Sequence, residues 1–369
     1  MEWYEVKNID QIDSPGLLVY TDRVAKNIDR MIEKVGGNPK RLFPHVKTHK
    51  MAEVVAMQMT KGITKFKCST IAELEMVANS GATEALIAYQ MVGPKIERLR
   101  NVALAFPTVT IASLVDNIAT AKELAAHFSK KNLTANVYLD VDNGMHRTGC
   151  PLDEDTFNVA AEIHRIPNIN FKGLHVYDGQ FRTPNLAERK RASDLAFRPV
   201  YGLVDRLQSE LQLDVCIING GSPSFSPASM RSTVFCSPGT VFFWDAGYQN
   251  IAPELGLDWA AVLISRIISK PTKGIITVDL GHKSVGAENP IHNRIRWLNL
   301  TNYEAYKHSE EHLMLKVDNW ENLSIGQVLY GVPFHVCPSV ALHEEAHIIR
   351  ENEWTENWQV VARKRKLTF

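Results

Sequence analysis

A lysine lies between two histidines at the end of an apolar run, in the sequence R-L-F-P-H-V-K-T-H-K-M at 41–51. His45, His49 and Lys50 surround Lys47 with positive or ionisable groups. A neighbouring cation or a dry pocket lowers the pKa of an amine, which can then attack a carbonyl carbon. The alternative is a basic strand end that faces solvent, as most clustered charges do. The positions of the other polar residues decide between these two interpretations.

Two glycine-containing turns could bind an anion, namely N-G-G-S at 219–222 and S-P-G-T at 237–240. Backbone amides approach an anion closely where no Cβ intervenes, although most glycines only serve turns. A phosphate held here, opposite a nucleophilic lysine, suggests two kinds of enzyme. One is a pyridoxal phosphate enzyme in which Lys47 forms a Schiff base, and the other is a sugar-phosphate aldolase.

Further candidate residues stand in three short motifs. Arg147 belongs to D-V-D-N-G-M-H-R-T-G at 140–149, and Tyr177 to G-L-H-V-Y-D-G at 173–179. The alternatives are a salt bridge between Arg147 and an aspartate of its own motif, and simple aromatic packing for Tyr177. His335 and Cys337 in P-F-H-V-C-P could offer a nitrogen and a sulfur to one divalent ion, or could be a core histidine beside a buried cysteine.

An alternation of strand and helix patterns runs through the first two thirds of the chain. Eight segments read as strands and most are followed by a helix: 41–47, 65–70, 85–90, 108–113, 135–142, 169–177, 214–219 and 233–236. The connections have the lengths of βα units, which predicts an α/β fold in which a (β/α)8 TIM barrel closes. A doubly wound open sheet is the structural alternative, because periodicity fixes element types better than topology.

The barrel would bring the candidate residues to one place. Chemistry in such barrels occurs at the C-terminal ends of the strands, where phosphate sites use the loops after strands seven and eight. Lys47 ends the first predicted strand, and Ser69 and Tyr89 end the next two. Arg147 follows the fifth and Tyr177 ends the sixth, whereas the two glycine turns follow the seventh and eighth.

The pattern changes after about Gly247, where helical periodicity disappears. Runs typical of strands occur at 261–268, 274–280, 313–317, 327–330, 334–342, 347–350 and 358–363. We therefore expect two domains, a barrel over 1–250 and an all-β C-terminal domain over 251–369 that carries His335 and Cys337. The first residues of the chain could pack on the β domain.

Composition limits the partners and the compartment. Lys plus Arg equals Asp plus Glu at 41 each, so no overall field recruits nucleic acid or an anionic membrane. The five cysteines are scattered without a C-x-x-C pair, which argues against a disulfide framework and favours a reducing compartment. The N-terminus lacks the pattern of a signal peptide and no apolar segment is long enough to span a membrane, so we expect a cytoplasmic protein.

These motifs together resemble one enzyme family. P-H-V-K-T-H-K, K-C-S-T-I-A-E-L-E-M-V-A-N-S-G-A followed by A-Y-Q-M-V-G-P, the arginine and tyrosine motifs, N-G-G-S and H-V-C-P occur in the expected order along nearly the whole chain. They resemble the D-threonine aldolase and D-serine dehydratase family, whose members are fold-type III pyridoxal phosphate enzymes akin to alanine racemase. The resemblance implies a barrel followed by a β domain and a homodimer with the active site at the interface.

The resemblance also implies roles for individual residues. It makes Lys47 the Schiff-base residue and places Arg147 at the pyridine nitrogen and Tyr177 near the cofactor ring. Around the phosphate it implies Gly220, Gly221, Ser222, Gly239 and Thr240. It makes His335 and Cys337 ligands of a divalent metal. Histidine with cysteine is similar to the dehydratase pattern and suits zinc, whereas aldolases can carry an oxygen ligand and use manganese.

The activity that the resemblance implies is that of a pyridoxal phosphate- and divalent-metal-dependent lyase acting on D-3-hydroxy amino acids. Retro-aldol cleavage to glycine and an aldehyde is the first expectation, because A-Y-Q-M-V-G-P-K-I-E-R-L resembles the bacterial aldolase-like branch. A D-serine dehydratase, which releases ammonia, is the alternative. An amino-acid racemase and a non-catalytic pyridoxal phosphate carrier remain as rivals, although a carrier has no use for the β domain.

Overall fold

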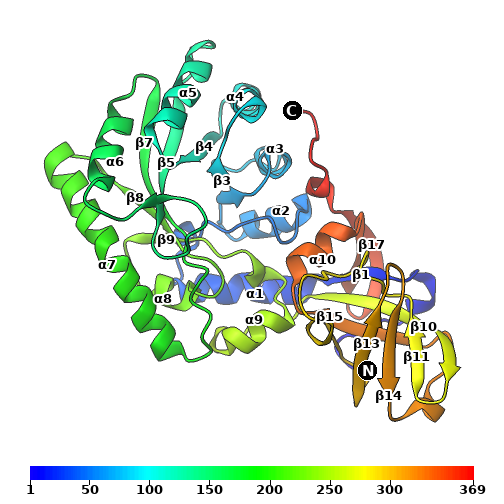
Figure 1. The fold of residues 1–369 in the computed structure, drawn as a ribbon. Helices are drawn as coiled ribbons and strands as arrows, with labels where there is room; N and C mark the ends of the chain where they lie inside the picture. The colour runs from blue at the N-terminus through cyan, green and yellow to red at the C-terminus, as the bar shows by residue number, and fades with distance from the viewer. The chain divides into compact units, whose positions relative to one another are not determined.

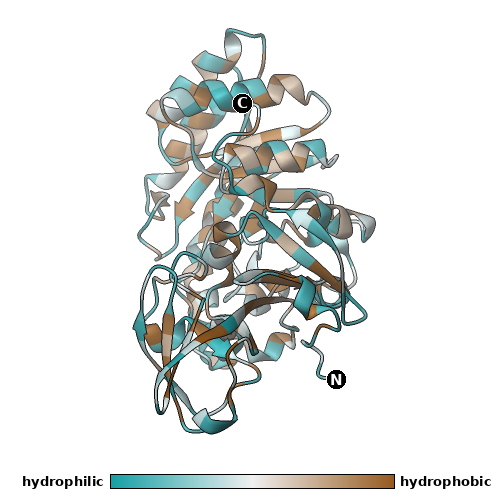
Figure 2. Cartoon of the chain, turned by 90° about the vertical axis from the view of Figure 1, so that its right-hand side faces the viewer, coloured by the Kyte–Doolittle hydropathy of each residue, from teal (hydrophilic) through white to brown (hydrophobic).

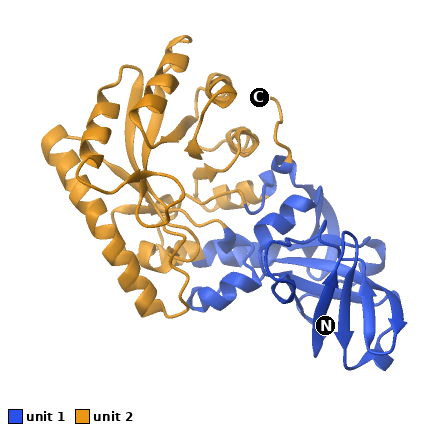
Figure 3. Cartoon of the chain, viewed as in Figure 1, with its two compact units in different colours: residues 1–30, 48–53, 240–363 blue, residues 31–47, 54–239, 364–369 orange.

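The computed structural model describes residues 1–369, which divide into two compact units (Figure 3). The barrel unit comprises 31–47, 54–239 and 364–369. The strand unit comprises 1–30, 48–53 and 240–363. The chain passes between them five times, and two of these passages lie within helices, α1 (Thr21–Lys34) and α2 (Ala52–Thr60).

The barrel unit is built on parallel strands that neighbour one another in the order β2-β3-β4-β5-β7-β8-β9 (Figure 1). They are β2 (Lys65–Cys68), β3 (Glu84–Gln90), β4 (Thr110–Val115), β5 (Ala135–Asp142), β7 (Ile169–Val176), β8 (Cys216–Asn219) and β9 (Val234–Cys236). A two-residue strand, β6 (Cys150–Pro151), pairs with the end of β5.

An eighth segment, 42–46, closes this sheet into a barrel. Leu42 forms a parallel bridge with Cys236 of β9, and His45 forms one with Lys67 of β2. The amides of Phe43 and His45 donate to the carbonyls of Cys236 and Pro238. On the other side, Val46 N–H donates to the Lys67 carbonyl at 2.9 Å. The segment therefore joins both edges of the sheet, as the eight predicted strands require.

Helices connect the strands of the barrel unit. They are α3 (Ile71–Asn79), α4 (Pro94–Ala105), α5 (Ile118–Ser129), α6 (Thr156–Arg165), α7 (Leu186–Leu211) and α8 (Phe225–Ser229), together with most of α2. Thr70, Asn117 and Asn185 cap the N-termini of α3, α5 and α7 by accepting a backbone N–H three residues ahead. Alternating apolar residues of the strands fill the centre, where Phe43, Leu86, Leu114, Tyr138 and Ile218 form one cluster. The predicted barrel is confirmed.

The strand unit contains a sheet in the order β13-β14-β11-β10-β1-β16-β17, with β15 pairing to β10 and β12. Its strands are β1 (Gly16–Tyr20), β10 (Ala261–Thr272), β11 (Ile275–Val278), β12 (Ile295–Trp297), β13 (Tyr303–His308), β14 (Leu313–Val317), β15 (Val328–Pro333), β16 (Glu345–Arg350) and β17 (Glu353–Gln359). β1 lies between β10 and β16, so residues from the start of the chain belong to this sheet. A core of Tyr4, Leu18, Val262, Tyr330 and neighbouring apolar residues packs against it.

Two strand predictions in this unit are wrong, and the domain is mainly rather than entirely β. Residues predicted as a strand at 334–342 form a helix, α10 (Val336–Leu342), and another helix, α9 (Ala246–Ile251), lies before β10 in the chain. The Asp245 carboxylate accepts the Val336 N–H at 3.1 Å and satisfies the start of α10, a contact between residues far apart in sequence. The predicted strand 358–363 ends at Gln359 and continues into a 3-10 turn at Val361–Arg363.

The distribution of hydropathy follows these elements. Hydrophobic segments lie along the strands, whereas hydrophilic residues occupy many of the turns (Figure 2). None of the helices combines the length and the apolar content needed to cross a membrane.

Candidate active site

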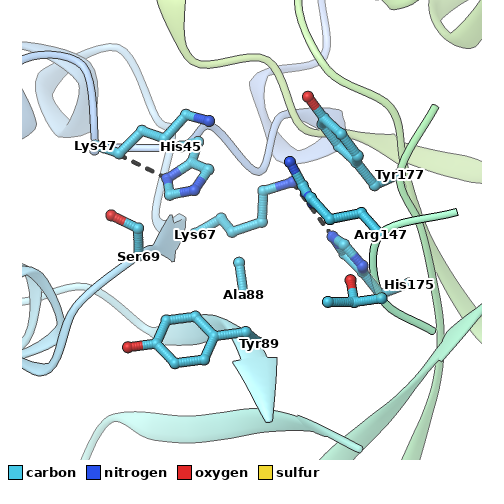
Figure 4. A pocket seen from close by; sticks show the side chains of 10 residues that line it. His45, Lys47, Lys67, Ser69, Ala88, Tyr89, Arg147, His175 and Tyr177 are labelled. Carbon is cyan, nitrogen blue, oxygen red and sulfur yellow. Dashed lines mark hydrogen bonds between the residues drawn. The ribbon is translucent and has the colours of Figure 1, made fainter. Parts of the chain in front are cut away.

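A cavity of about 230 Å³ in the barrel unit collects ionisable side chains at the C-terminal ends of the strands (Figure 4). Its lining is His45, Lys47, Lys67, Ser69, Ala88, Tyr89, Arg147, Thr148, His175 and Tyr177. Two lysines, an arginine and two histidines thus meet around one space, and no carboxylate lines it. This charge distribution fits an anionic occupant.

Lys47 reaches the cavity because it follows the segment that closes the barrel. The main chain is fixed there, since the His45 amide donates to the Pro238 carbonyl after β9 and the His45 Nδ1 atom accepts the Lys47 N–H at 3.3 Å. The Lys47 side chain remains partly exposed and points toward the space between His45 and Arg147 (Figure 4). An amine placed at the mouth of a barrel in this way can reach a bound carbonyl compound.

Arg147 and Tyr177 lie together on the opposite wall. Asp142 orders the loop after β5 by accepting the amides of Gly144 and His146 and by pairing with the His146 ring at 2.9 Å. Arg147 can then extend over Tyr177, with its Cζ atom 4.6 Å from the ring centroid. The structure thus gives Arg147 a cation–π contact in place of the salt bridge that its motif could have formed.

The structure also brings Lys67 into the cavity, a residue that the sequence analysis did not select. Lys67 lies within β2 and is only 2% exposed. Its Nζ atom lies 3.3 Å from Nε2 of His175, whose Nδ1 atom lies 2.7 Å from Asp140 Oδ1. Burial lowers the pKa of Lys67 to about 7, and the charge of Lys47 acts in the same direction. The available signal was the second lysine of K-F-K-C, which stands between two apolar residues. In an alternating strand, its side chain would point toward the barrel interior.

The two glycine turns are hydrogen-bonded to each other. Ser237 N–H donates to the Asn219 carbonyl at 3.0 Å, and Gly239 N–H donates to Ser222 Oγ at 3.3 Å. Gly220 has φ +88°, which favours glycine. A Cβ on Gly221 would lie 3.0 Å from Cε2 of Tyr177, so the first turn approaches the cavity wall closely. Thr240 belongs to the strand unit.

A buried carboxylate supports the first turn from behind. Asp178 is fully buried and accepts hydrogen bonds from Ser224 Oγ and from the Asn219 side chain. Burial raises the pKa of this carboxyl group, although its hydrogen bonds oppose the shift. Arg231 donates to Asn219 Oδ1 at 3.0 Å and extends the network. The position of the N-G-G-S turn is therefore set by buried polar contacts.

In the strand unit, His335 and Cys337 stand at the start of α10 rather than on a strand. His335 is the N-cap of α10 and pairs through Nδ1 with Glu288. Burial lowers the pKa of His335, but the hydrogen bond and charge of Cys337 outweigh it and raise the pKa to about 9. Thr48 Oγ1 lies 3.1 Å from Cys337 Sγ. No group of three or more His, Cys, Asp or Glu side chains that could hold a metal ion occurs in the structure.

The residues of the barrel cavity fit pyridoxal phosphate. The cavity offers an accessible amine and an excess of positive charge, and a side chain in place of Gly221 would crowd the wall beside it. The imidazole and sulfur of His335 and Cys337 are donors of the kind that zinc takes, and two protein donors leave positions for water or substrate oxygen.

Comparison with known proteins places the chain in a family. Residues 19–234 match the model described as "Alanine racemase, N-terminal domain", and residues 260–349 match the "Putative serine dehydratase domain". The chain is 26% identical to a 3-hydroxy-D-aspartate aldolase of Paracoccus denitrificans, with 96% of this chain and 92% of the relative covered. It is 24% identical to a D-threonine aldolase of Arthrobacter sp., covering 96% and 93%.

Solved structures agree with this assignment. A D-threonine aldolase from Filomicrobium marinum superposes with a TM-score of 0.88 at 25% identity, with 95% of each chain covered. The D-threo-3-hydroxyaspartate dehydratase from Delftia sp. HT23 shares the fold, with a TM-score of 0.80 at 20% identity and coverage of 95% and 97%. The resemblance to the D-threonine aldolase and D-serine dehydratase family is confirmed, and the chain belongs to the alanine racemase N-terminal domain family, followed by a serine dehydratase-type domain.

Proposed function

We propose that this protein is a pyridoxal phosphate-dependent lyase that cleaves D-3-hydroxy amino acids, with retro-aldol cleavage to glycine and an aldehyde as its main reaction. The observation that carries the proposal is the cavity in which Lys47 faces Arg147, Tyr177 and a second lysine without a carboxylate in the lining. Relatives named 3-hydroxy-D-aspartate aldolase and D-threonine aldolase match nearly the whole chain and support this choice.

When bound, pyridoxal phosphate supplies an electron sink that stabilises negative charge on the α-carbon of an amino acid. Lys47 would hold the cofactor covalently and, once freed by the substrate amine, is placed to move a proton in the cavity. Arg147 would face the pyridine nitrogen, where a guanidinium donates a hydrogen bond without giving up its proton. Tyr177 would pack beside the ring.

The phosphate would occupy the pair of glycine turns. Gly220, Gly221 and Ser222 of one turn and Gly239 and Thr240 of the other are the residues that we propose for it. The support is the mutual hydrogen bonding of the turns and the close approach of Gly221 to Tyr177. Where a turn lacks Cβ atoms, its backbone N–H groups can approach the anion closely.

We further propose His335 and Cys337 as ligands of a divalent zinc or manganese ion, which would add a Lewis acid for a substrate oxygen. A homodimer in a reducing, cytoplasmic compartment completes the proposal. It is supported by the resemblance and by five cysteines that are all free of disulfides.

A product assay tests the reaction. The purified protein is incubated with pyridoxal phosphate, zinc or manganese, and D-threonine, D-serine, D-phenylserine or 3-hydroxy-D-aspartate. Glycine plus an aldehyde is expected, whereas a keto acid with ammonia identifies a dehydratase and an inverted amino acid identifies a racemase. A relative named D-threo-3-hydroxyaspartate dehydratase makes the dehydratase the second candidate.

Two variants assign the site in the same assay. Lys47→Ala is expected to abolish turnover and the visible absorption of the bound cofactor. Lys95→Ala is the matched control, because Lys95 is exposed on α4 and contacts only Tyr89 at the rim. Unchanged turnover in Lys47→Ala, or bound cofactor without any product from the four substrates, would refute the proposed function.

A further inference from the structure

Lys67 is a second amine in the cavity that the proposed function leaves unused. It lies on β2 beside the segment that carries Lys47, since His45 and Lys67 are register partners. Lys65, two residues earlier on the same strand, pairs instead with Glu84 at 3.2 Å and lines a different cavity. The two lysines of one strand thus serve opposite ends of the barrel, and only Lys67 can reach a molecule bound beside Lys47.

Two other buried residues orient the Lys67 amine. Asp140 and His175 are 5% and 4% exposed, and the Asp140 carboxylate accepts from Nδ1–H of His175 at 2.7 Å. With the ring proton assigned to Nδ1 by this contact, Nε2 carries a lone pair and accepts from the Lys67 ammonium at 3.3 Å. The chain of contacts from Asp140 through His175 therefore fixes where the Lys67 positive charge lies.

The charges around Lys67 favour an anionic or electron-rich neighbour. Lys47 and Arg147 are the cations that face it, and Asp140 and Asp178 are the anions. Asp140 is engaged with His175, and Asp178 is held by Ser224 and Asn219 behind the glycine turn. On the cavity side Lys67 has positive neighbours and the Tyr177 ring, whose centroid lies 5.8 Å from Nζ. A bound anion would stabilise the ammonium.

We propose that Lys67 is a second cofactor-contacting residue, whose ammonium lies against a polar atom of the bound pyridoxal phosphate ring and is oriented there by His175 and Asp140. This inference rests on the proposed function. In it Lys67 touches the cofactor, whereas His175 and Asp140 are positioning residues that act through Lys67. Because a bound anion would stabilise the ammonium, its positive charge would make the loss of a proton from the bound cofactor easier and would stabilise negative charge on the ring.

The test is the pH titration of the visible absorption of the cofactor-loaded protein. Lys67→Met removes a cation beside the ring and is expected to raise the titration midpoint by roughly one unit or more. Lys67→Arg keeps the charge and is expected to restore the midpoint. Asp140→Asn removes the partner that holds His175 and a negative charge that helps to keep Lys67 protonated, so it is expected to raise the midpoint as well, by less than Lys67→Met does. Lys65→Met is the matched control and should leave it unchanged.

Raised midpoints in Lys67→Met and Asp140→Asn, with no further shift when Asp140→Asn is added to Lys67→Met, support the inference, because a direct effect of the Asp140 charge on the cofactor would lower the midpoint instead. An unchanged midpoint in Lys67→Met overturns it, and if that variant does not fold, an unchanged midpoint in Asp140→Asn does so. Borohydride reduction and peptide mapping of the wild type separate the two proposals. Cofactor on neither lysine means that the proposed function has failed, whereas cofactor on Lys47 with unshifted midpoints means that only this inference has failed.

Discussion

At the scale of single residues, the site depends on two lysines in different surroundings. Lys47 lies at the partly exposed mouth of the cavity, and Lys67 lies in its buried wall beside His175. Sequence reasoning found Lys47 because two histidines mark it, and it found Arg147 and Tyr177 because they follow strand ends. It missed Lys67, because alternation shows only that this lysine turns toward the barrel interior, and the closure of the barrel is needed to show that it lies beside the segment of Lys47. The chemical roles of all these residues stay predictions.

Burial of Lys67 predicts a pH dependence of stability in the cofactor-free protein. Its pKa falls from 10.5 to about 7 on folding, so between these values the folded chain binds fewer protons than the unfolded chain. The free energy of unfolding contributed by this residue therefore rises with pH in that range. We expect cofactor-free Lys67→Met to melt at a higher temperature than the wild type at pH 6, with the difference shrinking by pH 9. A difference that is the same at both pH values would contradict this account.

The pair at the start of α10 predicts metal binding. Cys337→Ser and His335→Gln each remove one of two protein donors, so each is expected to reduce bound zinc at least roughly tenfold after dialysis. Metal content is measured by mass spectrometry of the purified protein. Cys150→Ala is the control, because Cys150 lies in the barrel unit. Retention of zinc in both variants would show that the metal, if present, has other ligands.

At the scale of elements, most of the barrel follows from local patterns. The strand at 135–142 has in the structure the bounds that its pattern predicts. The segment 334–342 was misread because its alternating apolar residues fit a strand as well as a short helix. Asp245 decides in favour of the helix by accepting its first amide. A contact between residues so distant in sequence leaves no local signal.

The packing of β7 on β8 predicts a large effect at one glycine. A Cβ on Gly173 of β7 would lie 1.9 Å from the Cys216 carbonyl oxygen, and its φ is +140°. Gly173→Ala is therefore expected to lower the free energy of unfolding by about 3 kcal/mol or more, or to prevent folding. Gly202→Ala in α7 is the control. A Cβ there would meet nothing within 4 Å, so it should stabilise the helix by up to about 1 kcal/mol. Equal effects in denaturant unfolding would disprove the packing argument.

The first glycine turn predicts a selective effect on the cofactor. A Cβ on Gly221 would come 3.0 Å from Cε2 of Tyr177, so Gly221→Ala must displace the ring or the turn. We expect pyridoxal phosphate to bind roughly tenfold more weakly, because a shift of a few tenths of an ångström would misplace the backbone N–H groups that bind the phosphate. Fluorescence titration with the cofactor measures the change, again with Gly202→Ala as the control. Unaltered affinity in Gly221→Ala would remove this turn from the phosphate site.

At the scale of the whole molecule, cofactor binding should be visible as stability. A ligand that binds only the folded chain adds about 2.7 kcal/mol to the free energy of unfolding at a hundredfold excess over its Kd. We expect the thermal midpoint of the wild type to rise with added pyridoxal phosphate and that of Lys47→Ala to rise much less. Lys95→Ala should respond as the wild type does. Equal midpoint shifts in all three proteins would place the cofactor away from Lys47.

The segment 42–46 is joined to its neighbours by only a few backbone hydrogen bonds, among them those from Phe43 and His45 to one side and from Val46 to the other. This segment closes the barrel, and Lys47 follows it directly. A molecule bound covalently to Lys47 and held by the turns after β8 and β9 would stabilise the contact between this segment and its neighbours. We therefore expect the cofactor-free protein to open locally at 42–46 more readily than elsewhere in the barrel. Cofactor binding should then slow amide hydrogen exchange at 42–46 more than in the other strands of the barrel.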